Sequence, residues 1–184
     1  RVTPESKGIS SEKLTQMIRE LSAARHTDMH HLLVLRNGKV ICECNFAPYR
    51  SGIWHATYSM CKSITGMAVG FLISEGKLSL DENVYDIFEK RNGLLQKILR
   101  PNLTVEHLLT MKSGVQFNEM GAVSGNDWVD SFLTAPVKGT PGEMFEYNSM
   151  NTYLLSAIVT ERTGMKMVDY LRPRLFEPLG NRLF

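Results

Sequence analysis

The sequence predicts an α/β (α+β) fold in which a helix and an N-terminal β-hairpin precede a mostly helical region. Residues 31–46, HLLVLRNGKVICECNF, place two β-favouring runs around an Asn-Gly pair, a strong signal for a tight hairpin. Residues 9–22 and 59–180 instead contain runs whose apolar residues repeat with the helical period. A chain of 184 residues suits one core, so we predict a single domain over residues 1–184.

The pattern S-x-x-K, a serine and a lysine three positions apart, occurs three times. The surrounding sequence must therefore decide which pair could be catalytic. The first pair, Ser10 and Lys13, lies in the helix predicted over residues 9–22. The apolar positions of this helix are Leu14, Met17, Ile18 and Leu21. Ser10 is the expected N-cap and Lys13 a solvated helix residue, so this pair is explained without chemistry.

The third pair, Ser74 and Lys77, straddles the predicted end of another helix. Gly76 is a natural residue just beyond a helix C-terminus. The side chains of Ser74 and Lys77 would therefore diverge, and this pair is rejected. Ser59 and Lys62 remain as the candidate pair.

Ser59 and Lys62 are expected on one helix face, with Cβ atoms about 5–6 Å apart. Unpaired backbone N–H groups at the helix N-terminus would stabilise a developing oxyanion. A serine hydroxyl needs an adjacent base. Lysine serves as that base only when desolvation or a neighbouring cation lowers its pKa, normally about 10.4. The alternative is that Ser59 only caps the helix.

The helix after Ser59 is apolar on most of its surface, which predicts a central position and would supply the desolvation. Its apolar residues are Ile64, Met67, Ala68, Phe71 and Leu72. Gly66 and Gly70, four positions apart, would let a neighbouring element approach the backbone closely.

Composition and charge narrow the class of protein. A formal net charge of +2, with Lys and Arg scattered, gives no basis for a nucleic-acid or membrane partner. No apolar run approaches the roughly 20 residues that span a bilayer. Three cysteines, Cys42, Cys44 and Cys61, are too few for a disulfide framework. We expect them to be small buried hydrophobes, and we favour a cytoplasmic over a secreted or periplasmic compartment.

Four histidines raise the question of a metal site: His30, His31, His55 and His107. His30 and His31 are adjacent, so on a strand they would face opposite sides. The segment VEHLL lacks the second histidine of an H-E-x-x-H motif. We therefore predict no metal site.

Four blocks of sequence resemble the serine β-lactamase and penicillin-binding-protein-like superfamily, in its class C and family VIII esterase branch. They are YSMCKSITGMAVGFLISEGKLSLDENV, LTVEHLLTMKSGV, PGEMFEYNSMNTYLLSAIVTERTG and LFEPLG. Their order and approximate spacing agree with that family from about residue 31 to residue 180. The first block contains the family's S-x-x-K nucleophile motif. The resemblance implies a β-lactamase-like serine-hydrolase fold, with residues 59–180 as its mainly helical catalytic region.

The resemblance also implies roles for particular residues. Ser59 would be the acylated nucleophile and Lys62 its proton-accepting partner. Tyr147 would be the tyrosine of a Y-x-N or Y-x-S motif that shares proton transfer with the lysine. Its alternative role is that of an amphipathic core aromatic with the hydroxyl at the surface.

The chain departs from the family's usual pattern in its second motif. Many relatives have Asn where this chain has Ser149, whose hydroxyl could hold Lys62 in place but cannot donate to a substrate amide as Asn does. This departure favours an esterase or related amide hydrolase over a β-lactam or peptide specialist. Ser149 is equally well explained as a helix N-cap. A further difference is MKSG, at residues 111–114, where relatives usually have HTSG.

The third family motif, K-T-G or a variant on a strand beside the active site, is absent from this chain. We therefore expect a partial domain, the N-terminal portion of the fold without the C-terminal strands. A lone hairpin is marginal in water and leaves unpaired edges. We expect a fragment, or a chain whose sheet a second chain completes, and little activity from residues 1–184 alone.

These observations predict a serine hydrolase that forms an acyl-enzyme with a small ester, amide or β-lactam and uses no cofactor. An ester-like substrate is favoured. The alternative is a catalytically silent penicillin-binding-like protein that binds ligands or partners or assembles.

Overall fold

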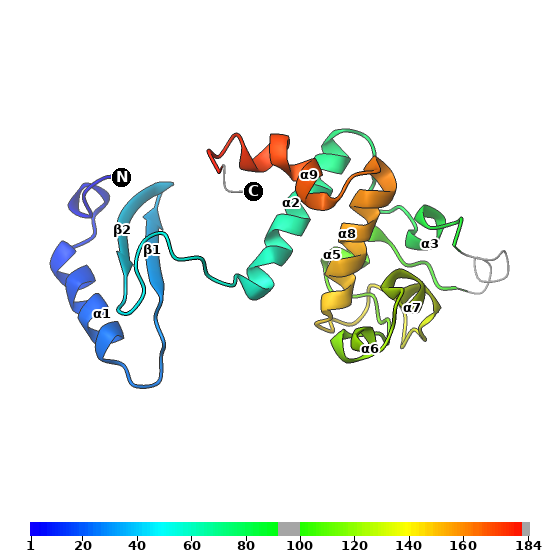
Figure 1. Cartoon of the computed structure of the whole chain (residues 1–184), viewed down its shortest axis with the longest axis horizontal. Helices are drawn as coiled ribbons and strands as arrows, with labels where there is room; N and C mark the ends of the chain where they lie inside the picture. The colour runs from blue at the N-terminus through cyan, green and yellow to red at the C-terminus, as the bar shows by residue number, and fades with distance from the viewer. Residues whose placement is uncertain (92–99, 182–184) are drawn as a thin grey trace. The chain divides into compact units, whose positions relative to one another are not determined.

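The computed structural model describes residues 1–91 and 100–181, and the chain divides into two compact units, Arg1–Ala56 and Thr57–Phe184 (Figure 1). The first unit contains one long helix and a hairpin, and the second contains the remaining helices. This content agrees with the predicted hairpin and mostly helical region. The expectation of one domain over residues 1–184 stays a prediction.

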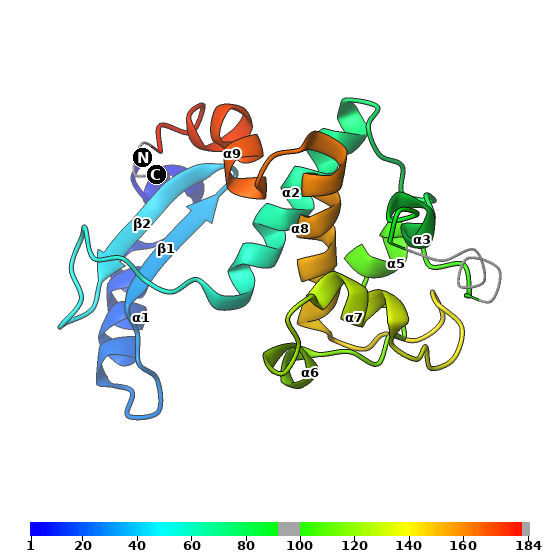
Figure 2. The same ribbon diagram turned by 45° about the vertical axis from the view of Figure 1, so that its right-hand side comes forward.

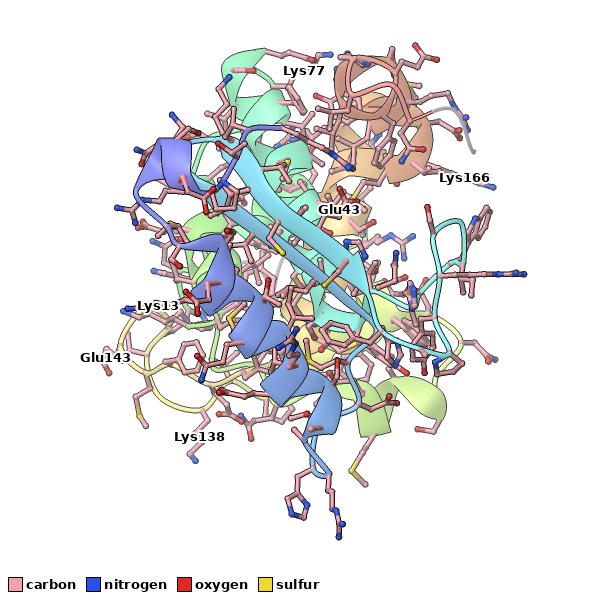
Figure 3. All side chains as sticks on the ribbon, turned by 90° about the vertical axis from the view of Figure 1, so that its left-hand side faces the viewer. Lys13, Glu43, Lys77, Lys138, Glu143 and Lys166 are labelled. Atoms are coloured by element: carbon pink, nitrogen blue, oxygen red, sulfur yellow. The ribbon has the colours of Figure 1, made fainter. Side chains whose placement is uncertain are left out.

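The first unit builds its long helix and its hairpin from local signals. Its elements are η1 (Glu5–Lys7), α1 (Ser11–Ala23), β1 (His31–Arg36) and β2 (Lys39–Asn45). As predicted, Ser10 is the N-cap of α1, and its hydroxyl accepts a hydrogen bond of 3.3 Å from the Lys13 N–H. None of the residues of α1 is buried. Lys13, labelled in Figure 3, is accordingly an exposed residue of this helix.

The hairpin turns at the Asn-Gly pair, as predicted. Asn37 and Gly38 have φ of 49° and 68°, which is the left-handed conformation that tight hairpin turns require. The antiparallel register pairs Arg36 with Lys39 and contains one irregularity, between Val34 and Leu35. This is a two-stranded sheet, and two leucines of β1, Leu33 and Leu35, remain about half exposed, at 48% and 53%.

The second unit packs short helices around two longer ones, α2 and α8. Its described elements are η2 (Tyr58–Met60), α2 (Cys61–Ser74), α3 (Val84–Ile87), α5 (Val105–Leu109), α6 (Glu119–Val123), α7 (Trp128–Thr134), α8 (Ser149–Thr163), α9 (Met167–Leu171) and a π-helical turn, η3 (Arg172–Phe176). The helix α8 contacts α2, α5 and α7, and Figure 2 shows α2 and α8 side by side. Buried side chains of these helices form one continuous core.

The helix α2 has one buried face and one open face. Its buried residues are Thr65, Ala68, Val69 and Leu72. The opposite face carries Gly66, Met67 and Gly70, and Met67 is 45% exposed. A Cβ atom added at Gly66 or Gly70 would meet no described atom within 4 Å. Within the second unit, therefore, no described element makes the close approach predicted at these glycines.

Two features of the sequence differ from the structure. Residues 113–143 are rich in Gly, Asn and Ser, which is typical of loops, and yet they contain the helices α6 and α7. Cys61 is exposed, and Cys42 and Cys44 are only partly buried, so these thiols are not core residues. Burial raises the pKa of the Cys44 thiol, and Cys42 beside it adds to the effect. None of the described helices is long and apolar enough to cross a membrane.

Candidate active site

Ser59 lies in the turn η2, directly before α2. The preceding residue, Tyr58, has φ of 44°, a left-handed conformation that is costly for a residue with a side chain. The N-cap position of α2 is Met60 rather than Ser59, and it makes no side-chain cap hydrogen bond. The Ser59 hydroxyl is therefore used elsewhere.

The Ser59 hydroxyl contacts two other side chains of the second unit. Its Oγ lies 2.6 Å from the Tyr147 hydroxyl oxygen and accepts a hydrogen bond of 2.9 Å from Lys62 Nζ. Lys62 reaches it from the first turn of α2, three residues along the chain. The same ammonium group lies 5.0 Å from the centroid of the Tyr147 ring. Three of the predicted site residues are thus brought together around one oxygen atom.

The electrostatics of this cluster act on Tyr147. Hydrogen bonds from Lys62 and then Ser59 hold the pKa of the Tyr147 hydroxyl below its ordinary value of 10, and the positive charge of Lys62 adds to this. Such contacts favour the phenolate, because they stabilise the charged form. Tyr147 is 55% exposed, so it is not the core aromatic of the alternative interpretation.

Tyr147 is held in place by its neighbour Asn148, which the sequence analysis missed. Asn148 is the N-cap of α8, and its side-chain oxygen accepts a hydrogen bond of 2.9 Å from Met150 N–H. Its buried amide group donates to the carbonyl oxygens of Val115 at 3.1 Å and Phe117 at 2.8 Å. Asn148 therefore ties the segment before α8 to the residues before α6.

Ser149 is the first residue of α8, so its interpretation as the N-cap is wrong by one position. Ser149 is the largest cause that lowers the pKa of the Glu119 carboxyl group and a lesser cause of the lowered pKa of the Tyr147 hydroxyl. Ser149 thus stands beside the reacting groups. Its predicted part in holding Lys62 stays a prediction.

The MKSG segment, residues 111–114, contacts residues on both sides of Tyr147 in the sequence. The backbone N–H of Glu146 donates to the Met111 carbonyl oxygen at 2.9 Å. The buried hydroxyl of Ser113 donates to Asn151 of α8 at 2.8 Å. Gly114 has φ of 67°, and a Cβ atom there would lie 2.5 Å from the Lys138 carbonyl oxygen. A side chain at position 114 would therefore displace this support.

Glu119, which sequence reasoning also missed, brings a negative charge to the site. It begins α6, a helix that contacts α8. Hydrogen bonds from Ser149 lower the pKa of its carboxyl group, and the positive charge of Lys62 lowers it further. Glu119 lies 28 residues before Tyr147 in a segment that reads as loop, so no local pattern could have identified it.

The histidines fall into separate environments. In the first unit, His30 Nδ1 lies 3.1 Å from His55 Nδ1, and the His30 ring stacks on Tyr49. In the second, His107 and Thr104 form a capping box at the start of α5. No group of three or more His, Cys, Asp or Glu side chains is placed to hold a metal ion within residues 1–91 and 100–181.

Comparison with known proteins places this geometry in context. A family model described as Beta-lactamase matches residues 14–183. Esterase EstB of Burkholderia gladioli is 28% identical over 153 residues, which cover 73% of this chain and 39% of the esterase. Penicillin-binding protein 4 of Amycolatopsis lactamdurans is 29% identical over 160 residues, which cover 83% of this chain and 40% of that protein.

A solved structure gives the same picture of the fold. The octameric penicillin-binding protein homologue from Pyrococcus abyssi matches with a TM-score of 0.67 at 27% identity, over 94% of this chain and 43% of that one. The predicted β-lactamase-like fold, in its N-terminal portion, is therefore confirmed. The chain spans about two fifths of the length of the curated relatives named above.

Proposed function

Because the chain belongs to the Beta-lactamase family, we propose that it is a serine hydrolase that acts through an acyl-enzyme on Ser59. The family supports a general serine hydrolase function, and the proposal extends this to named residues. One observation carries it. The Ser59 oxygen lies within hydrogen-bonding distance of both Lys62 Nζ and the Tyr147 hydroxyl, which are the groups that could take its proton.

In the proposed acylation step, Ser59 Oγ attacks the carbonyl carbon of the substrate and forms a tetrahedral intermediate. The proton of the hydroxyl passes to the pair formed by Tyr147 and Lys62. The lowered pKa of Tyr147 supports its phenolate as the acceptor, with the Lys62 ammonium beside it. The intermediate then collapses, and the same proton goes to the leaving alcohol or amine.

Deacylation would use the same groups in reverse. A water molecule attacks the carbonyl carbon of the acyl-enzyme and gives its proton to Tyr147. The bond to Ser59 Oγ breaks, the acid is released, and Ser59 takes the proton back. No cofactor enters this sequence, because every proton is returned by the side chains that accepted it.

The proposed substrate class is a small ester, with amides and β-lactams as further members. Ser149 stands where many relatives have Asn, and its hydroxyl cannot donate to a substrate amide as an Asn side chain does. One of the similar proteins is named an esterase and another a penicillin-binding protein. The Ser149 substitution favours the ester.

We also propose that a further strand-bearing segment or a second chain completes the sheet. The half-exposed Leu33 and Leu35 on β1 support this proposal, because apolar side chains on a strand of a small sheet are usually covered.

Intact-protein mass spectrometry after exposure to a fluorophosphonate tests the assignment of Ser59. We expect one adduct on the complete protein and none on its Ser59→Ala variant, with a weaker reaction from residues 1–184 alone. The matched control is Ser63→Ala, an exposed serine one turn further along α2. An adduct that persists in Ser59→Ala contradicts the site. A complete protein that forms none supports the silent, ligand-binding alternative.

A further inference from the structure

Two histidines of the first unit bring ring nitrogens together at the open end of the hairpin. His30 directly precedes β1, His55 lies in the segment after β2, and their Nδ1 atoms are 3.1 Å apart. The neighbouring His31 has a different partner, because its Nδ1 lies 2.9 Å from Asn45 Oδ1. The absence of a metal site expected from the sequence concerns His30 with His31 and the H-E-x-x-H spacing. Neither describes this pair, whose members are 25 residues apart.

The other ring nitrogen of His30 determines which nitrogen offers a lone pair. His30 Nε2 lies 3.4 Å from the carboxylate oxygen Oδ2 of Asp28. A carboxylate only accepts hydrogen bonds, so in the neutral ring Nε2 carries the proton and Nδ1 carries the lone pair. His55 Nδ1 is then the donor of the pair. A carboxylate behind the outer nitrogen is also the usual arrangement at a metal-binding histidine, where it fixes the tautomer and the ring orientation.

The rings are held in place, and the spacing of their Nδ1 atoms suits a shared ion. The rings of His30 and Tyr49 are stacked with centroids 3.7 Å apart, and the His55 ring lies 5.4 Å from that of Tyr49. Nitrogen ligands about 2.0–2.1 Å from a tetrahedral Zn²⁺ lie roughly 3.4 Å from each other, so the two nitrogens need to part only slightly. His55 is exposed and the His30 side chain is 42% exposed, so an ion can reach them from solvent.

The first unit has a small core of its own to hold the segment after β2. Its buried hydrophobic residues are Ile41 and Phe46, and α1 has none. Small units with so little core are commonly stabilised by a metal ion or a disulfide. The three cysteines of the chain are free, so no disulfide has this role. A metal ion on His30 and His55 would join the segment before β1 to the segment after β2.

We propose that His30 and His55 bind a divalent transition-metal ion of the Zn²⁺ type through their Nδ1 atoms. Imidazole nitrogen suits such ions, whereas Mg²⁺ prefers oxygen ligands. As the ion enters, the proton of His55 moves from Nδ1 to Nε2, so both Nδ1 lone pairs face the ion. No third His, Cys, Asp or Glu side chain of residues 1–91 and 100–181 joins the pair as a ligand, so water completes the coordination. The site is independent of the acyl transfer proposed at Ser59.

Calorimetric titration of the complete protein with ZnCl₂ tests the site, with MgCl₂ as the salt that should not compete. We expect His55→Gln to bind one ion fewer than the parent, because a single imidazole remains. Asp28→Asn should keep the site and weaken it about tenfold, since it removes the group that orients the ligand. The matched control is His31→Gln, which removes the adjacent imidazole and should bind as the parent does. Equal binding by the parent and His55→Gln overturns the proposal.

A second measurement identifies the ligand atoms in the parent itself, so it does not depend on the folding of a variant. In ¹⁵N NMR spectra of the histidine side chains, Zn²⁺ should shift the Nδ1 signals of His30 and His55 together and leave those of His31 in place. Nδ1 signals of His30 and His55 that do not move overturn the proposal. A Zn²⁺-dependent dimer in analytical ultracentrifugation that is lost in His55→Gln also overturns it, because the ion would then link two molecules.

Discussion

The two units of the chain differ in how much apolar surface each buries by itself. In Thr57–Phe184, buried side chains from seven helices, from Ala68 to Leu171, form one continuous core. In Arg1–Ala56, the buried hydrophobic residues are Ile41 and Phe46, and α1 has none. Ser59, Lys62 and Tyr147 all come from the second unit, Thr57–Phe184. The candidate site therefore belongs to the helical unit, whose own core can hold it rigid without the hairpin.

The strongest way to test this comparison is to remove one side chain from each unit. Phe132 of α7 is fully buried, so Phe132→Ala should lower the free energy of unfolding by about 3–5 kcal/mol. Leu33→Ala in β1 should cost less than about 0.5 kcal/mol, because that side chain is already half exposed. Urea denaturation followed by circular dichroism measures both.

The cost of Leu33→Ala also tests whether β1 is covered in solution. A cost for Leu33→Ala similar to that for Phe132→Ala would mean that another chain or segment covers β1 in solution. The contrast between the units would then be a property of residues 1–184 alone.

A smaller effect on the free energy of unfolding is expected at Tyr58, directly before the candidate nucleophile. Tyr58 adopts φ of 44° although its side chain is 85% exposed, so packing within the described residues does not hold it there. Tyr58→Gly should raise the free energy of unfolding by about 1 kcal/mol, because glycine adopts this conformation without strain. Tyr58→Ala keeps the strain and is the control.

The same variants test whether the strain serves Ser59. Fluorophosphonate labelling of Tyr58→Gly should be slower than that of Tyr58→Ala, because a flexible glycine fixes the Ser59 hydroxyl less firmly. Equal rates with a more stable Tyr58→Gly would mean that the left-handed turn has no part in positioning the nucleophile.

The features that the sequence predicted correctly depend on short-range chemistry. The Asn-Gly turn and the Ser10 cap each involve residues within four positions of one another. Gly76, with φ of 66°, ends α2 by the same kind of signal. Such contacts form wherever the local sequence favours them, which is why they can be read without the fold.

The features that the sequence analysis missed depend on packing between distant segments. Asn148 reaches back more than 30 positions to Val115 and Phe117, and the helix α6, which begins at Glu119, packs on α8. The family resemblance indicated Ser59, Lys62 and Tyr147. It did not indicate Glu119, which stands in a segment without a motif. Gly66 and Gly70 allow a close neighbour, but small residues do not identify which element that neighbour is.

The smallest expected effect on stability concerns two ion pairs of Glu75, one of which joins distant parts of the helical unit. Glu75, just after α2, accepts hydrogen bonds of 2.6 Å from Arg174 in η3 and of 2.6 Å from Lys77. These partners, Arg174 first, lower the pKa of Glu75 from 4.5 to about 2. In the unfolded chain the carboxyl group should titrate near its ordinary value, so the folded state binds fewer protons between the two values.

The sign of the pH effect follows from this lowered pKa. The contribution of Glu75 to stability is fully present above pH 4.5 and is lost as the pH falls through about 2. Because the Glu75 and Arg174 side chains are partly exposed, the loss should be modest and should shrink in added salt. Urea denaturation from pH 2 to pH 6 should show a shallower acid loss in Glu75→Gln than in the parent. Glu161→Gln, an exposed glutamate of α8, should keep the slope of the parent. If both variants follow the parent, the contacts to Arg174 and Lys77 do not persist in solution, and the helical unit is less tightly closed at this end than its core implies.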